Sequence, residues 1–273
     1  MRQDISRGRI GLLIGSLLAA IVGMLLIDPI PQDVGYHAFA DTRGHGGIHN
    51  FADTISNLGF LIVGLAGLWC TAGPGSRSLF ADRREATPYL VFFIGVAAVA
   101  IGSAYYHLAP DNGRLFWDRL PMTVGFTGLF AAFIADRIAP RAITWLLPLL
   151  VLSGVASLLY WDVTEAAGRG DLRFYALVQF YPVLALPLIC WLFPRGRLTC
   201  GRHLTGIAGF YLLAKLLEHF DHQIFDLLGG TISGHTLKHL AAATAAGLVI
   251  AMLHRRAAPQ ARFNRPVLSL NWH

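Results

Sequence analysis

The sequence predicts an all-α polytopic membrane protein, and its composition and hydropathy carry this prediction. Of its 273 residues, 55% are hydrophobic and only 14% are charged, and the mean hydropathy is +0.53. Soluble domains carry about 25% charged residues. Apolar runs of about 20 residues, which match a bilayer core of about 30 Å, recur along the chain. This composition excludes a soluble enzyme, a disordered chain, a disulfide scaffold and a nucleic-acid binder.

Each apolar run is expected to be a membrane-spanning helix, because a spanning segment must satisfy its backbone N–H and C=O groups internally. The eight runs cover residues 9–27, 53–72, 88–107, 118–136, 142–160, 174–193, 204–225 and 234–254. The linkers are short and carry Gly, Pro or charge, as in Gly73-Pro74-Gly75. They leave no room for a soluble domain.

The first run could also be a signal peptide, with Arg2, Arg7 and Arg9 before it and the small residues of Ala38-Phe39-Ala40 after it. However, the run is long for a signal core, and Ala40 lies about 13 residues beyond its end. An uncleaved N-terminal helix is therefore expected. The cysteines, Cys70, Cys190 and Cys200, form no CxxC motif, and unbridged thiols are expected.

The arginines indicate the orientation, because cytoplasmic loops of membrane proteins are enriched in Lys and Arg. Alternate loops and the terminal segments carry Arg2, Arg7, Arg9, Arg77, Arg83, Arg84, Arg137, Arg141, Arg195, Arg197, Arg202, Arg255, Arg256, Arg262 and Arg265. The opposite loops carry Arg43, Arg114, Arg119, Arg169 and Arg173. Both termini are thus expected in the cytoplasm, and the Arg-, Ala- and Gly-rich composition favours a bacterial inner membrane.

Polar side chains lie at one membrane depth, toward the extracytoplasmic side. Ser103 and His107 end the third run, Asp118 begins the fourth, and His235 and His239 begin the eighth. Ionisable groups inside spans cost about 2.5–3.5 kcal/mol each on insertion scales, which makes them functional candidates.

The spacing of these residues fits a metal site. His235 and His239 are i and i+4, so both imidazoles project from one helix face. Three neutral imidazoles can bind zinc and leave a fourth position for water, whose proton Asp118 could accept. Ser103 could bond a substrate carbonyl. Each residue also has a simpler explanation: a chance histidine pair, a packing role for His107, or an N-cap role for Asp118.

Four stretches carry a family resemblance: Thr54-Ile55-Ser56-Asn57-Leu58, Gly102-Ser103-Ala104-Tyr105-Tyr106-His107, Asp118-Arg119-Leu120-Pro121-Met122 and His235-Thr236-Leu237-Lys238-His239. In this order they resemble the alkaline ceramidases, seven-helix membrane zinc amidases related to the progestin and adiponectin receptors. The resemblance implies a seven-helix hydrolase core at 53–254. It leaves an extra N-terminal helix and extracytoplasmic loop at 1–52, and a basic cytoplasmic tail at 255–273.

The resemblance also implies roles for the polar residues. His107, His235 and His239 match the zinc ligands, Asp118 matches the carboxylate that activates water, and Ser103 matches the serine beside the amide. The implied reaction is hydrolysis of the N-acyl bond of ceramide to sphingosine and a fatty acid. The implied partners are therefore a lipid substrate and the membrane, and no protein partner is inferred.

Some polar residues fall outside this pattern. Eukaryotic relatives also bind calcium, but Asn50 stands where they have a Glu, which argues against a Ca²⁺ site even though Asp33, Asp41 and Asp53 are near. His37, His45 and His49 in the Gly-rich stretch could bind a second metal, but a flexible solvated loop is the expected structure. Lys215 and Glu218 are spaced for an ion pair, and the roles of His219, Asp221 and His222 stay open.

Other functions remain possible for this constellation. A related hydrolase could act on another N-acyl lipid or on an ester, and a receptor or a metal transporter could share the ligand set. A transporter needs a polar path through the membrane, whereas the cytoplasmic halves of the third and eighth runs are almost wholly apolar. This difference favours the enzyme.

Overall fold

The computed structural model describes residues 2–199 and 201–263, and in this part of the chain every regular element is helical. The long helices are α1 (Arg2–Leu26), α3 (Leu58–Ala72), α5 (Arg83–Leu108), α6 (Asn112–Arg137), α7 (Ile143–Ala166), α8 (Arg173–Leu192), α9 (Gly201–His219) and α11 (Gly234–Phe263). The short ones are α2 (Phe51–Ser56), α4 (Ser76–Leu79) and α10 (Asp221–Leu227), with 3₁₀ turns at Val34–His37 and Pro140–Ala142. Cys200 and the end of the basic tail, with Arg265, lie outside the described residues.

Six segments of the described chain are long and apolar enough to cross a membrane, which indicates a multi-pass membrane protein. They are Arg7–Leu26, Phe51–Ala72, Arg83–Leu108, Pro140–Ala166, Arg173–Leu192 and Gly234–Arg255. The other two expected spans form α6 and α9, of 26 and 19 residues. Both are less apolar because they carry charged residues, among them Asp118 in α6 and Glu218 in α9.

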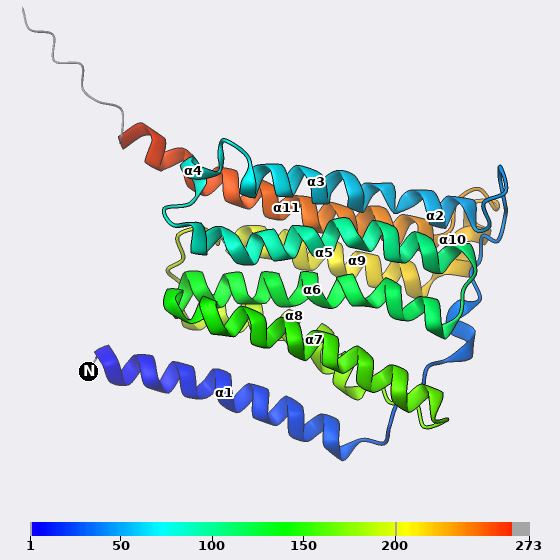
Figure 1. Cartoon of the computed structure of the whole chain (residues 1–273), viewed down its shortest axis with the longest axis horizontal. Helices are drawn as coiled ribbons and strands as arrows, with labels where there is room; N and C mark the ends of the chain where they lie inside the picture. Colours follow the sequence, from blue (N-terminus) through cyan, green and yellow to red (C-terminus); the bar gives the residue numbers. More distant parts are fainter. Residues whose placement is uncertain (1, 200, 264–273) are drawn as a thin grey trace, which may run out of the picture.

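The long helices run side by side as a bundle (Figure 1). Helix α5 packs against α3 and α6, α11 packs against α9 and α3, and α6 also contacts α7 and α8. Helix α1 lies at the edge and packs against α8. The start of α1 and the end of α11 are at one end of the bundle, and α2 and α10 are at the other end (Figure 1).

Glycines bring α5 and α6 into close contact. A Cβ on Gly95 would lie 2.6 Å from the backbone nitrogen of Gly125, and one on Gly102 would overlap the carbonyl oxygen of Trp117. Small residues of this kind let two helix backbones approach. This contact places the last turns of α5 next to the first turns of α6.

Several expected helix boundaries are wrong. The expected helix 53–72 is divided at Asn57 into α2 and α3. The fourth helix begins at Asn112 rather than at residue 118, and Asp111 is its N-cap, with Oδ1 accepting from the backbone N–H of Arg114 at 2.7 Å. Asp118 therefore lies inside α6 and does not cap it. The expected helix 204–225 is interrupted at Phe220, which separates α9 from α10.

Candidate metal centre

Three histidines from two helices meet at the end of the bundle that holds α2 and α10. His107 lies in the last turn of α5, and His235 and His239 lie in the first turns of α11. Their candidate ligand atoms all lie within 4.8 Å of one another, and the side chains are buried, with exposures of 1%, 4% and 2%. The structure thus brings together all three predicted ligands in a cluster that could hold a metal ion.

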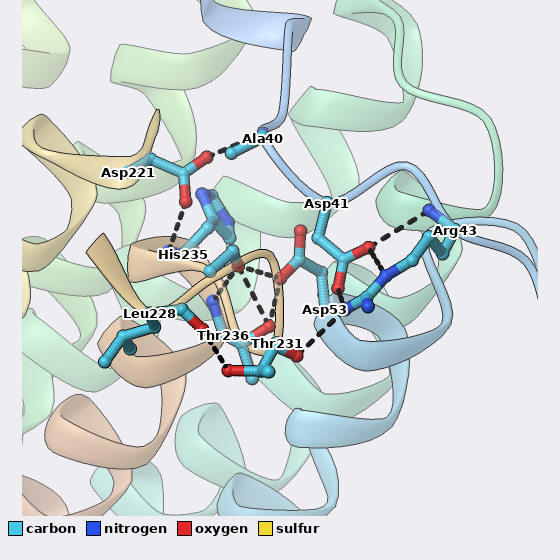
Figure 2. A network of polar contacts seen from close by, with 10 residues as sticks. Ala40, Asp41, Arg43, Asp53, Asp221, Leu228, Thr231, His235 and Thr236 are labelled. Carbon is cyan, nitrogen blue, oxygen red and sulfur yellow. Dashed lines mark hydrogen bonds and ion pairs between the residues drawn. The ribbon is translucent and has the colours of Figure 1, made fainter. Parts of the chain in front are cut away.

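Asp221, at the start of α10, holds the first turn of α11 in place (Figure 2). Its Oδ1 accepts from the backbone N–H of His235 at 2.7 Å, and its Oδ2 accepts from the backbone N–H of Ala40 at 2.9 Å. A carboxylate at a helix N-terminus satisfies a free N–H and complements the helix dipole. Asp221 therefore fixes the turn that carries His235 and ties it to the loop before α2.

Ser56 sets the tautomer of His239. The Ser56 hydroxyl donates its one hydrogen to the carbonyl oxygen of Asp53 at 2.9 Å. In the contact of 2.7 Å between Ser56 and His239, the Nδ1 of the ring therefore donates to the Ser56 oxygen. A proton on Nδ1 leaves Nε2 with a free lone pair. Partners of this kind orient metal-binding histidines, although Ser56 was not predicted as a site residue.

His107 fits the role of a ligand because its Nδ1 is buried and has no hydrogen-bond partner among the described residues. Buried polar atoms are nearly always paired, so an orphaned one needs an explanation. The Asn50 amide bonds the His107 carbonyl oxygen at 2.8 Å, and the Phe39 ring covers His107 and His235 at centroid distances of 4.7 and 4.6 Å. The donor set suits a divalent transition metal and does not distinguish zinc from its neighbours.

Two acidic residues near the centre, Asp53 and Asp41, contact other polar side chains (Figure 2), and Oδ2 of Asp53 has no hydrogen-bond partner among the described residues. Asp53 accepts from the hydroxyls of Ser233 and Thr236 at 3.0 and 2.5 Å. Asp41 forms an ion pair of 2.7 Å with Arg43, whose guanidinium holds the pKa of Asp41 below its ordinary value. Asp41 is thus already neutralised by a cation, a poor setting for calcium, which binds through several oxygens.

Ser103 and Asp118 line a cavity of about 190 Å³ together with His239. Both are buried, with exposures of 2% and 8%. The rest of the wall is mainly apolar and includes Phe92, Val96, Val99, Leu186, Ile207, Ala242 and Ala246. Three of the five predicted site residues, Ser103, Asp118 and His239, therefore line this cavity, and His107 and His235 adjoin it through the histidine cluster.

An ion-pair cluster of Lys215, Glu218 and Lys238 adjoins the histidines. Glu218 bridges the two ammonium groups, at 2.6 Å from Lys215 and 2.7 Å from Lys238. The pair of Lys215 and Glu218 is as expected from the spacing. The contact of 3.1 Å between Lys238 Nζ and His235 Nε2 was not predicted.

The other histidines take no part in the cluster. The His37 ring bonds Tyr106 at 2.8 Å and Asn112 at 2.9 Å, so this end of the expected solvated loop is fixed to the bundle. His45 and His49 are exposed, and the His222 ring donates to the carbonyl oxygen of Ala38 at 3.0 Å. Within the described residues, the three-histidine group is the one cluster that could hold a metal.

No protein-family model and no curated protein matches the sequence.

Proposed function

We propose that this chain is a zinc-dependent membrane amidase that hydrolyses the N-acyl bond of a lipid, with ceramide as the expected substrate. One observation supports this proposal above all: a carboxyl, a hydroxyl and one member of the buried three-histidine cluster line the same apolar cavity. The four stretches that resemble the alkaline ceramidases contain all five predicted site residues.

The cavity has the length and lining that an acyl chain needs. Its wall follows α5 from Ser103 back to Phe92, which is a rise of about 16 Å at 1.5 Å per residue. The side chains along this path are apolar, so they would solvate a hydrocarbon tail and would not conduct an ion. This lining favours lipid chemistry over metal transport.

In the proposed topology all eight long helical segments cross the membrane, including α6 and α9. The arginine distribution places both termini in the cytoplasm. The histidines lie at the opposite end of the bundle from the start of α1. The active site then faces the extracytoplasmic side, where a lipid could enter from the membrane.

In the proposed reaction, water adds to the amide carbonyl carbon and the C–N bond breaks, which gives a carboxylic acid and an amine. A zinc ion held by His107, His235 and His239 would polarise the carbonyl and make water more acidic. Asp118 accepts the proton of the attacking water and passes it to the leaving nitrogen. Ser103 donates a hydrogen bond to the carbonyl oxygen as negative charge develops there.

Replacement of Asp118 tests this proposal, because Asp118→Asn keeps the shape of the side chain and removes the base. Release of fatty acid from a fluorescent ceramide should fall by about 10²–10⁴-fold, the usual contribution of general acid–base catalysis. The metal content should stay unchanged.

Asp162→Asn is the matched control, since Asp162 is an exposed aspartate on α7. It should retain full turnover. Equal rates for the two variants would contradict the role of Asp118, and a folded wild-type chain that turns over no N-acyl lipid would contradict the proposed function. A receptor or transporter with the same metal ligands would also turn over no N-acyl lipid.

A further inference from the structure

The Lys238 ammonium is the feature of the site that the proposed hydrolysis does not use. It lies one residue before His239 and lines the same cavity as Ser103 and Asp118. Its side chain is 18% exposed. A cation inside a membrane helix is costly, and such residues line substrate paths or pair with a counter-charge.

Lys238 shares the carboxylate that pairs with it. Glu218 is shared between Lys238 and Lys215, and Tyr36 also donates to it at 3.1 Å. Two ammonium groups therefore share one carboxylate. Asp118 lines the cavity from α6 and is the one acidic residue on its wall within the described residues.

The ammonium also has a donor to spare. It carries three N–H groups, and the acceptors that contact it within residues 2–199 and 201–263 are Glu218 Oε1 and His235 Nε2. The His235 lone pair cannot accept from Lys238 and bind a metal through Nε2 at once. A metal bound there would release a second N–H of Lys238 toward the cavity.

The position of Lys238 along the cavity indicates which part of a lipid it would meet. The apolar wall runs from Ala242 to Ala246 on α11, away from the end of the bundle that holds α2 and α10. If the acyl chain lies along this apolar wall, the part of the lipid attached to the amide nitrogen lies at the end of the cavity that holds Lys238. Lys238 is the one cation that lines the cavity in the described part of the chain, so it is where a ligand carboxylate would bind.

We propose that Lys238 forms a subsite for a carboxylate on the amine side of the substrate. Ceramide, which is uncharged, is then bound and hydrolysed without using this subsite, and acidic N-acyl lipids, such as N-acyl amino acids, bind more tightly than uncharged ones. This inference rests on the proposed function, because it assumes that an acyl lipid occupies the cavity. A charge-assisted hydrogen bond of this kind both strengthens binding and fixes the orientation of the ligand.

The test measures binding rather than turnover, with the full chain in detergent micelles and three probes: N-lauroylglycine, the uncharged N-lauroylethanolamine and laurate. Wild type should bind N-lauroylglycine at least about tenfold more tightly than the ethanolamide, as expected for a hydrogen bond to a charged group. Laurate should bind more weakly than N-lauroylglycine, because its carboxylate lies on the acyl side.

Three variants separate the subsite from a general charge effect. Lys238→Met should abolish the preference for the acid and still fold, since Glu218 keeps its partner Lys215. Lys238→Arg should retain the preference. Lys215→Met should also retain it, because Lys215 holds the same carboxylate without lining the cavity.

Several outcomes would overturn the proposal: no preference in wild type, an unchanged preference in Lys238→Met, an equal loss in Lys215→Met, or a Lys238-dependent gain for laurate alone. The measurement also stands apart from the amidase proposal. Lys238-dependent binding without turnover supports the subsite and contradicts the amidase. Ceramide turnover without any preference for the acid supports the amidase and contradicts the subsite.

Discussion

At the scale of single residues, the hydrogen bond between Ser56 and His239 decides which ring nitrogen is free for a metal. Ser56→Ala removes the acceptor of the Nδ1 proton, so the ring is less well oriented. Metal affinity should fall by about 10–100-fold, the usual cost of losing such a partner, as measured by competition with a chelator. Ser153→Ala is the control, because the half-buried Ser153 hydroxyl donates to the carbonyl oxygen of Leu149 within α7. Equal affinities would show that Ser56 does not orient the ligand.

Asp171, in the loop between α7 and α8, gives a prediction for pH. Arg173 lies 2.8 Å away, and its hydrogen bonds lower the pKa of Asp171 from 3.8 to about 2. Because the folded-state pKa is lowered, the stabilisation is fully present above pH 3.8 and is lost as the pH falls toward about 2. The melting temperature of Asp171→Asn should therefore depend less on pH in this window than that of wild type.

Thermal unfolding in detergent, followed by fluorescence at several pH values, checks this prediction. Asp162→Asn, whose carboxylate is exposed, should follow the wild-type curve. A parallel pH dependence in wild type and Asp171→Asn would mean that the pair with Arg173 contributes no stability.

At the scale of helices, the close approach of α5 and α6 positions the site. Gly102→Ala places a methyl group against the Trp117 carbonyl and forces the helices apart next to Ser103. Such overpacking costs about 1–3 kcal/mol, so the melting temperature and the turnover should both fall. Gly15→Ala, where nothing lies within 4 Å of an added Cβ, should leave both unchanged, and the same result for Gly102→Ala would show that the contact is dispensable.

Hydropathy alone does not predict every helix boundary in this chain. The segment from Asp111 to Arg119 carries four charged residues, so the sequence predicted a linker followed by a helix at 118. The N-cap at Asp111 nevertheless starts α6 there, because helix formation depends on capping and backbone hydrogen bonds and not on apolar content. The start of the eighth helix at Gly234 was predicted correctly, since Gly229 and Gly230 end the preceding segment.

The candidate site combines features that local spacing predicts with contacts between residues far apart in the sequence. The shared helix face of His235 and His239 follows from their spacing alone. The bond between Ser56 and His239 joins residues 183 positions apart, and no local pattern predicts it. The same holds for Asp221 and the backbone of Ala40, and for Lys238 and Glu218, because these contacts depend on how the helices pack.

At the scale of the whole molecule, the proposed orientation predicts which loops are accessible. In a chain without its native cysteines, Arg169→Cys should react with a membrane-impermeant maleimide added outside the cell. Arg84→Cys, at the other end of the bundle, should react only after permeabilisation. Both positions are exposed, so each serves as the control for the other, and the reverse pattern would invert the topology.

The most direct test of the central claim is a zinc titration of the metal-depleted, folded chain with fatty acid release from ceramide as the readout. We expect turnover to be absent without metal, to rise in proportion to bound zinc and to saturate at one ion per chain, and His239→Ala to abolish both binding and turnover. His254→Ala, far along α11 from the cluster, should behave as wild type. Full turnover by metal-free protein, or zinc binding that is unaffected in His239→Ala, would contradict the account.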